Sequence, residues 1–112
     1  MAPTASDLKK YNKIGTAFAG FHYDLNFITI HGRSRYPGLF LWTRDMKKMP
    51  VSMPEGCLLL QCGIMLEQLT GGYCMAGYHE VVYNERTEQV VQKKLAENEN
   101  GGKNIMWRVS ST

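Results

Sequence analysis

The feature that most constrains this chain is a series of short apolar and aromatic runs, several of them bounded by turns rich in glycine or proline. The runs with the β-branched and aromatic composition of strands are residues 21–30, 39–42, 57–62, 73–83 and 105–111. Turn sequences such as Pro54-Glu55-Gly56 and Thr70-Gly71-Gly72 separate them at short intervals. Such a pattern predicts a mainly β fold, either a jelly-roll barrel or a sandwich.

One helix is expected late in the chain. Asn84 is a good N-cap, and Val90, Val91 and Leu95 follow it at helical spacing, so a helix is predicted over residues 85–98. The sequence Asn100-Gly101-Gly102 should end it. With 112 residues in total, the chain has room for a single domain, residues 1–112.

Composition narrows the range of partners. The net charge is only +3 and the basic residues are scattered, whereas a nucleic-acid surface needs a basic patch, so no nucleic-acid partner is expected. No apolar run has the length of a membrane span and no signal peptide is visible, which predicts a cytoplasmic protein without a membrane partner. Three cysteines form no disulfide framework, and Cys57 and Cys62 are expected to pack within a buried strand.

The residues that carry chemistry begin with His22 and Asp24. They are two apart on the run 21–30, so on a strand both side chains would project from one face, about 7 Å apart along the chain. His79, within the run 73–83, is the natural third ligand. Two imidazoles and one carboxylate on one side of a metal leave adjacent positions open, which suits Fe(II) oxygen chemistry. His31 is expected to be structural or solvent-facing.

A second pair, Arg108 and Ser110, is again two residues apart, on the last predicted strand. A guanidinium fork beside a hydroxyl forms a site for a carboxylate. The alternative is a surface arginine beside a small residue. Because Met106, Arg108 and Ser110 share one face of the strand, the arginine can equally point into a barrel, where it would need an anion.

Taken in chain order, these residues resemble the isopenicillin N synthase-like branch of the 2-oxoglutarate and Fe(II)-dependent dioxygenases. Further blocks resemble that family in the same order: Phe21-His22-Tyr23-Asp24-Leu25 through Thr29, Tyr36-Pro37-Gly38-Leu39, Pro54-Glu55-Gly56-Cys57-Leu58 and Leu69-Thr70-Gly71-Gly72. The resemblance covers about residues 16–83, with 105–111 as its end.

The resemblance implies a double-stranded β-helix (jelly roll) that is incomplete, with the helix 85–98 inserted before the last strand. It also implies Fe(II) held by His22, Asp24 and His79, and 2-oxoglutarate as cosubstrate anchored by Arg108 and Ser110. The expected activity is that of a dioxygenase, an oxidoreductase that uses O₂ to oxidise a small organic substrate. Ascorbate is a further reductant used by some relatives.

Two other functions stay open: a catalytically inactive jelly-roll binding module, and an Fe(II) oxidase of the same family that is independent of 2-oxoglutarate. Relatives are much longer than this chain, and a barrel that lacks strands exposes edges that pair with other chains. A homo-oligomer formed through exposed strand edges is therefore also expected.

Overall fold

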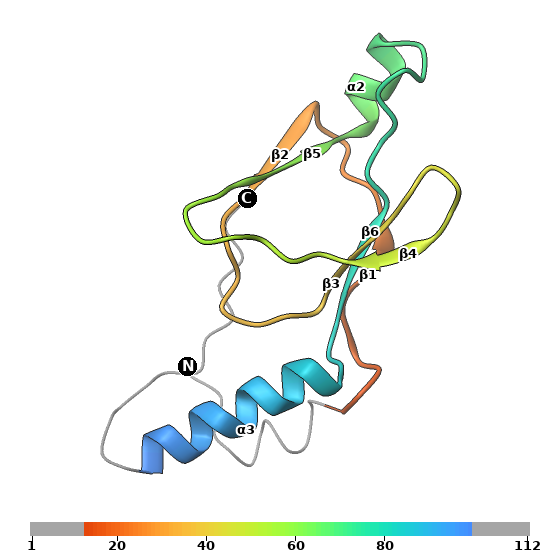
Figure 1. Cartoon of the computed structure of the whole chain (residues 1–112). Coiled ribbons are helices and arrows are strands. Elements are labelled where there is room, and N and C mark those ends of the chain that lie inside the picture. Colours follow the sequence, from red (N-terminus) through yellow and green to blue (C-terminus); the bar gives the residue numbers. More distant parts are fainter. Residues whose placement is uncertain (1–12, 100–112) are drawn as a thin grey trace.

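The structure is a computed structural model that describes residues 13–99. Its elements are β1 (Ala17–His22), β2 (Ile28–His31), β3 (Leu39–Trp42), β4 (Lys48–Pro50), β5 (Leu59–Cys62), α2 (Ile64–Leu69), β6 (His79–Val82) and α3 (Glu85–Glu99). Figure 1 shows an elongated body, with α2 at one end and α3 at the other. Its principal extents are 54 × 27 × 25 Å. None of the helices in this range is long and apolar enough to cross a membrane.

The strands form two antiparallel sheets, which confirms the mainly β class. One sheet has the order β1-β6-β3-β4, and the other consists of β2 and β5. In the first sheet His22 lies opposite His79, and in the second Thr29 lies opposite Gln61. Only β3 and β4 are neighbours in both sequence and sheet, and the other pairings join strands that are far apart in sequence, such as β1 with β6 and β2 with β5.

The composition of residues 21–30 predicted a single strand, but the structure divides this run between two strands. β1 ends at His22, and β2 begins at Ile28 in the other sheet. The intervening loop is held by the start of α2, where the amides of Ile64 and Met65 donate to the carbonyls of Asp24 and Asn26 at 2.9 and 3.2 Å. These contacts are long-range, so the continuous aromatic composition gave no sign of the break. The run 73–83 is likewise shorter than predicted, because only His79–Val82 forms β6.

The strand predicted over residues 57–62 is present but shorter, and the prediction that it is buried is wrong. β5 begins at Leu59, Cys57 is exposed, and Leu58 and Leu60 are 65% and 64% exposed. The reason is that the two-stranded sheet has one covered face, so alternate residues point outward. Of the β5 residues it is Gln61, the polar one, that is buried.

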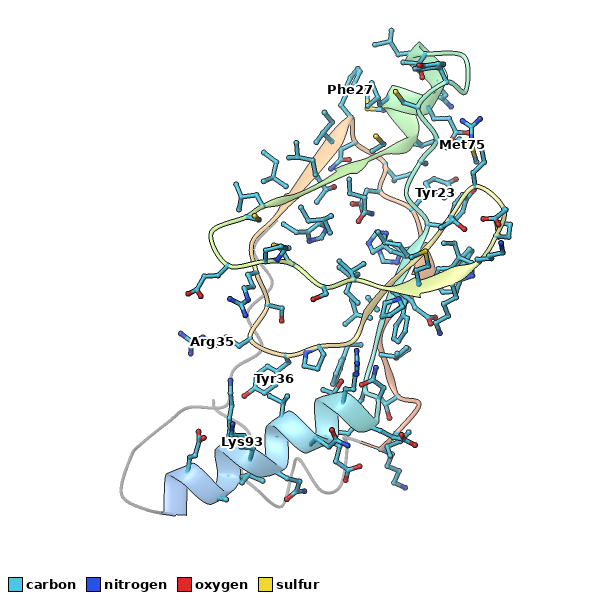
Figure 2. All side chains as sticks on the ribbon, viewed as in Figure 1. Tyr23, Phe27, Arg35, Tyr36, Met75 and Lys93 are labelled. Atoms are coloured by element: carbon cyan, nitrogen blue, oxygen red, sulfur yellow. The ribbon has the colours of Figure 1, made fainter. Side chains whose placement is uncertain are left out.

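The predicted helix is confirmed as α3. The side chain of Asn84 caps it, since its Oδ1 accepts a hydrogen bond from the Thr87 amide at 2.9 Å. Val91 forms a buried cluster with Tyr36 and Tyr83, against which Val90 and Leu95 pack. Figure 2 shows Tyr36 directed towards this helix.

The buried apolar set of the described range is small, consisting of Tyr36, Ala76, Tyr83 and Val91. Many large apolar side chains are exposed, among them Ile28 and Ile30 on β2. The homo-oligomer expected from such surfaces stays a prediction. The last predicted strand, 105–111, and the glycine stop at 100–102 lie outside the described residues.

Candidate metal centre

The two candidate histidines are cross-strand neighbours. His22 is the last residue of β1 and His79 the first of β6, and these positions are paired in the antiparallel sheet. Their ring centroids lie 4.1 Å apart. The sheet register therefore brings together two imidazoles that are far apart in sequence.

Asp24 completes the group from the loop that follows β1. The prediction that His22 and Asp24 project from the same face of one strand is therefore wrong, because β1 ends at His22. Oδ1 of Asp24 lies 3.7 Å from Nε2 of His22 and 3.9 Å from Nε2 of His79. One ligand atom from each residue falls within 4.8 Å of the others. The close approach of α2 fixes this loop, since a Cβ at Gly63 would lie 1.9 Å from the Asn26 carbonyl oxygen.

A glycine carbonyl orients each ring. Nδ1 of His22 lies 2.6 Å from the Gly20 carbonyl oxygen, and Nδ1 of His79 lies 2.9 Å from that of Gly77. When Nδ1 carries the proton and donates it there, the lone pair of Nε2 is free to face Asp24. Histidine ligands in metalloproteins are usually held in this way, with the distal N–H on a carbonyl or carboxylate.

The residues fit a metal ion. Bonds of about 2 Å at right angles put neighbouring donor atoms about 3 Å apart. The separations from Asp24 exceed this by less than about 1 Å, which small side-chain rotations can close. His22, Asp24 and His79 would then supply two imidazoles and one carboxylate to the ion, a donor set that suits non-haem Fe(II).

The centre borders an open cavity of about 1380 Å³. All three residues line it, together with His31, Arg33 and Arg35. The ring of His31, expected to be structural or solvent-facing, lies 6.2 Å from that of His79, so it belongs to the surroundings of the centre. The exposure of the side chains falls from 43% at His22 through 20% at Asp24 to 4% at His79, so the centre is open on one side and closed on the other.

Sequence reasoning missed a short pattern that builds this centre twice. Gly20-Phe21-His22 and Gly77-Tyr78-His79 are the same glycine, aromatic, histidine unit. The units face one another across β1 and β6, with the rings of Phe21 and Tyr78 stacked at 5.2 Å. The repeated tripeptide could have been noticed. The buried polar neighbours Thr29 and Gln61 gave no signal.

The predicted cosubstrate anchor, Arg108 and Ser110, lies outside the described residues. Its position relative to the three candidate ligands stays a prediction.

No protein-family model matches the chain, and no curated protein matches its sequence. Its fold resembles that of several solved structures. One, from Shewanella oneidensis and proposed to be an oxygenase, is 29% identical with a TM-score of 0.60. A full-length protein from Neurospora crassa, solved in complex with alpha-KG, is 22% identical with a TM-score of 0.59. A proposed 2OG-Fe(II) oxygenase family protein from Caulobacter crescentus is 23% identical with a TM-score of 0.55.

The matches cover 67%, 71% and 71% of this chain in that order, but only 28%, 24% and 40% of the neighbours. The chain thus spans well under half the length of the proteins it resembles. The likeness shows that the chain shares a fold with part of these proteins, and the His-Asp-His group gives it a possible metal site.

Proposed function

We propose that this chain is the core of a non-haem Fe(II) oxygenase that uses O₂ and 2-oxoglutarate to oxidise a small organic substrate. The observation that carries the proposal is the convergence of His22, Asp24 and His79, whose ligand atoms lie within 4.8 Å of one another at the edge of a large cavity. Non-haem Fe(II) oxygenases use this donor set with open positions beside it.

In this proposal the two sheets form part of a jelly roll of the isopenicillin N synthase-like branch. His22, Asp24 and His79 hold the iron, and Arg108 with Ser110 holds the far carboxylate of 2-oxoglutarate. When bound, iron and cosubstrate supply oxidation of a substrate C–H bond by O₂, with release of succinate and CO₂. The protein orients the ligands: Gly20 and Gly77 accept the distal N–H groups, and the start of α2 holds the loop that carries Asp24.

The test is anaerobic titration of the chain with Fe(II) and then 2-oxoglutarate, followed by the metal-to-ligand absorption band. Asp24→Ala should abolish Fe(II) binding. Asp45→Ala is the matched control, because Asp45 is an exposed carboxylate paired with Lys47 at a hairpin tip. Equal Fe(II) affinity in wild type and Asp24→Ala would refute the assignment of the metal ligands.

The same titration separates the alternatives. Arg108→Ala should weaken 2-oxoglutarate binding far more than Fe(II) binding. An Fe(II) oxidase that does not use 2-oxoglutarate would bind iron and consume O₂ with another reductant such as ascorbate, but would show no 2-oxoglutarate turnover. An inactive binding module would consume no O₂ with any cosubstrate.

A further inference from the structure

The second sheet presents two buried polar residues to the metal centre. Thr29 of β2 and Gln61 of β5 lie directly opposite one another in the antiparallel register. They are 5% and 4% exposed, whereas the outward-facing residues Ile30 and Leu60 are 51% and 64% exposed. A small apolar core that buries a threonine and a glutamine side by side must hydrogen-bond them. Their hydrogen bonds lead to the candidate ligands.

Thr29 binds the carboxylate. Its hydroxyl donates to Oδ2 of Asp24 at 2.5 Å, while the Asn26 amide donates to the hydroxyl oxygen at 2.9 Å. Because Oδ2 is occupied in this way, Oδ1 is the oxygen that faces both imidazoles. The hydroxyl thus fixes the rotation of the carboxylate about its last side-chain bond.

Gln61 contacts the buried imidazole. Its Nε2 lies 2.5 Å from Nδ1 of His79 and 3.0 Å from the Gly77 carbonyl oxygen. Its Oε1 is buried and has no hydrogen-bond partner among residues 13–99. An amide donor requires Nδ1 without a proton, whereas the Gly77 carbonyl, 2.9 Å from Nδ1, requires Nδ1 with one. The two neighbours of Nδ1 therefore favour opposite tautomers of His79.

Only one of these tautomers can bind a metal through Nε2. If the proton is on Nδ1, Nε2 offers its lone pair; if Gln61 donates to Nδ1, the proton of the neutral ring is on Nε2. A half-turn of the Gln61 amide would exchange its two ends and bring Oε1, now unsatisfied, beside Nδ1 as an acceptor. The same turn gives up the hydrogen bond from Gln61 Nε2 to the Gly77 carbonyl, which then accepts from Nδ1 instead. The ring would then move its single proton from Nε2 to Nδ1, by exchange with solvent, and lose none.

We propose that Thr29 and Gln61 are a cross-strand pair of positioning residues for the metal centre. Thr29 holds the carboxylate so that Oδ1 faces the ion, and the orientation of the Gln61 amide selects the tautomer of His79. Metal binding at Nε2 and the turn of the amide occur together. The inference rests on the proposed function for the identity of the site, and it assigns roles to residues outside the three ligands.

The first experiment reads the tautomer directly, by ¹⁵N–¹H correlation of the imidazoles in metal-free and Zn²⁺-loaded protein. Zn²⁺ is the probe because it is diamagnetic and binds nitrogen and oxygen ligands more tightly than Fe(II). In metal-free wild type the His79 proton should be on Nε2, and Zn²⁺ should move it to Nδ1. In Gln61→Glu, whose carboxylate only accepts, the proton should be on Nδ1 before any metal is added.

The second experiment measures Zn²⁺ affinity in matched variants. Gln61→Leu and Thr29→Val should each weaken Zn²⁺ binding about 10- to 100-fold, the usual effect of removing an outer partner of a metal ligand. Thr29→Ser keeps the hydroxyl and Gln61→Glu keeps an acceptor, so both should bind within a few-fold of wild type. Their comparison with wild type still tests the pair if the apolar variants fail to fold.

The inference is overturned if His79 has the same tautomer in metal-free and Zn²⁺-loaded wild type, or if Gln61→Leu and Thr29→Val bind Zn²⁺ as tightly as wild type. In that case the Asp24→Ala variant still tests the metal centre separately from the positioning roles of Thr29 and Gln61. If Asp24→Ala loses Zn²⁺ while the pair variants keep it, the metal centre stands and the pair does not. If wild type itself binds neither Zn²⁺ nor Fe(II), the proposed function fails and the positioning roles fail with it.

Discussion

The segments Gly20–His22 and Gly77–His79 have the same sequence pattern but different surroundings. In each, Nδ1 of the histidine lies close to the carbonyl of the glycine two residues before it. The His79 side chain is 4% exposed and that of His22 is 43% exposed. A Cβ on Gly77 would meet Gln61, whereas a Cβ on Gly20 would meet nothing within 4 Å.

The difference shows which property of the centre is local and which depends on the fold. The orientation of each ring comes from its own tripeptide, so it is the same at the edge and in the interior. The His79 ring also contacts Gln61 of the second sheet and is buried, whereas the His22 ring is exposed. The His22 half of the centre is therefore the half that is open to solvent.

Replacing the two histidines should give the largest effects and separate these properties. His22→Ala and His79→Ala should each weaken Fe(II) binding by more than about 100-fold, above the range seen for outer-shell partners. In chelator, however, His79→Ala should lower the free energy of unfolding by about 2 kcal/mol, since it leaves buried partners unsatisfied. His22→Ala should change it by less than about 0.5 kcal/mol, as at other surface positions. Urea unfolding of the metal-free protein measures this free energy. Equal losses in the two variants would show that the buried and the exposed histidine contribute alike to stability.

Replacing Gly77 should also destabilise the protein more than replacing Gly20. Gly77→Ala puts a Cβ 2.7 Å from Cγ of Gln61, an atom near the backbone and not the free end of that side chain, and should cost about 1–3 kcal/mol of stability. Gly20→Ala has open space and should be neutral or stabilise β1 by up to about 1 kcal/mol. Thermal unfolding and Zn²⁺ titration of both variants measure this. If the Gly77→Ala protein were as stable as Gly20→Ala, Gln61 would not pack closely against the segment Gly77–His79.

The aromatic rings between glycine and histidine should couple the two segments. Phe21 stacks on Tyr78 with centroids 5.2 Å apart, and also meets Trp42 edge-on at 4.6 Å. A double-mutant cycle of Phe21→Leu and Tyr78→Leu should give a coupling energy of about 0.5–1.5 kcal/mol. Phe21→Leu combined with Tyr73→Leu, at an 86% exposed side chain, is the control and should be additive. A zero coupling for the first pair would mean that the segments are joined by the backbone ladder alone.

Much of the centre was predictable because it depends on local features. The residue types and the order His22, Asp24, His79 indicated a metal site, and the structure brings those three together. The prediction of α3 was correct; it depended on the N-cap Asn84 and on the spacing of Val90, Val91 and Leu95. Both signals come from residues close together in sequence, so they can be recognised without knowledge of the fold.

The rest depends on contacts between distant residues. The strand break after His22 is set by hydrogen bonds from α2, about forty residues on, which no local pattern reveals. Leu58 and Leu60 were expected to be buried because of their composition, but which face of a two-stranded sheet is covered depends on the other sheet. For the same reason Gln61 was overlooked, because a polar residue in an apolar run becomes informative only when its neighbour across the sheet is known.

The smallest expected effect concerns the end of β6 that leads away from the centre. Tyr83 follows β6 and ties it to the start of β1, since its carbonyl accepts from the Gly15 amide and its amide donates to the Thr16 carbonyl, both at 2.8 Å. Burial raises the pKa of the Tyr83 phenol, and the negative charge of Glu88 raises it further. Strand β6 thus has a buried residue at each end, His79 and Tyr83.

A raised pKa means that the folded protein holds the phenol proton more tightly than the unfolded chain. The stability from this group is therefore fully present below about pH 10, the ordinary tyrosine value, and is lost as the pH rises through the folded pKa. Tyr83→Phe keeps the ring that packs against Phe18 and removes the titrating group. We expect urea midpoints measured between about pH 8 and pH 11 to fall less steeply for Tyr83→Phe than for wild type. Since lysine titration is common to both proteins, parallel curves would show that the Tyr83 phenol ionises in the fold as freely as in the unfolded chain.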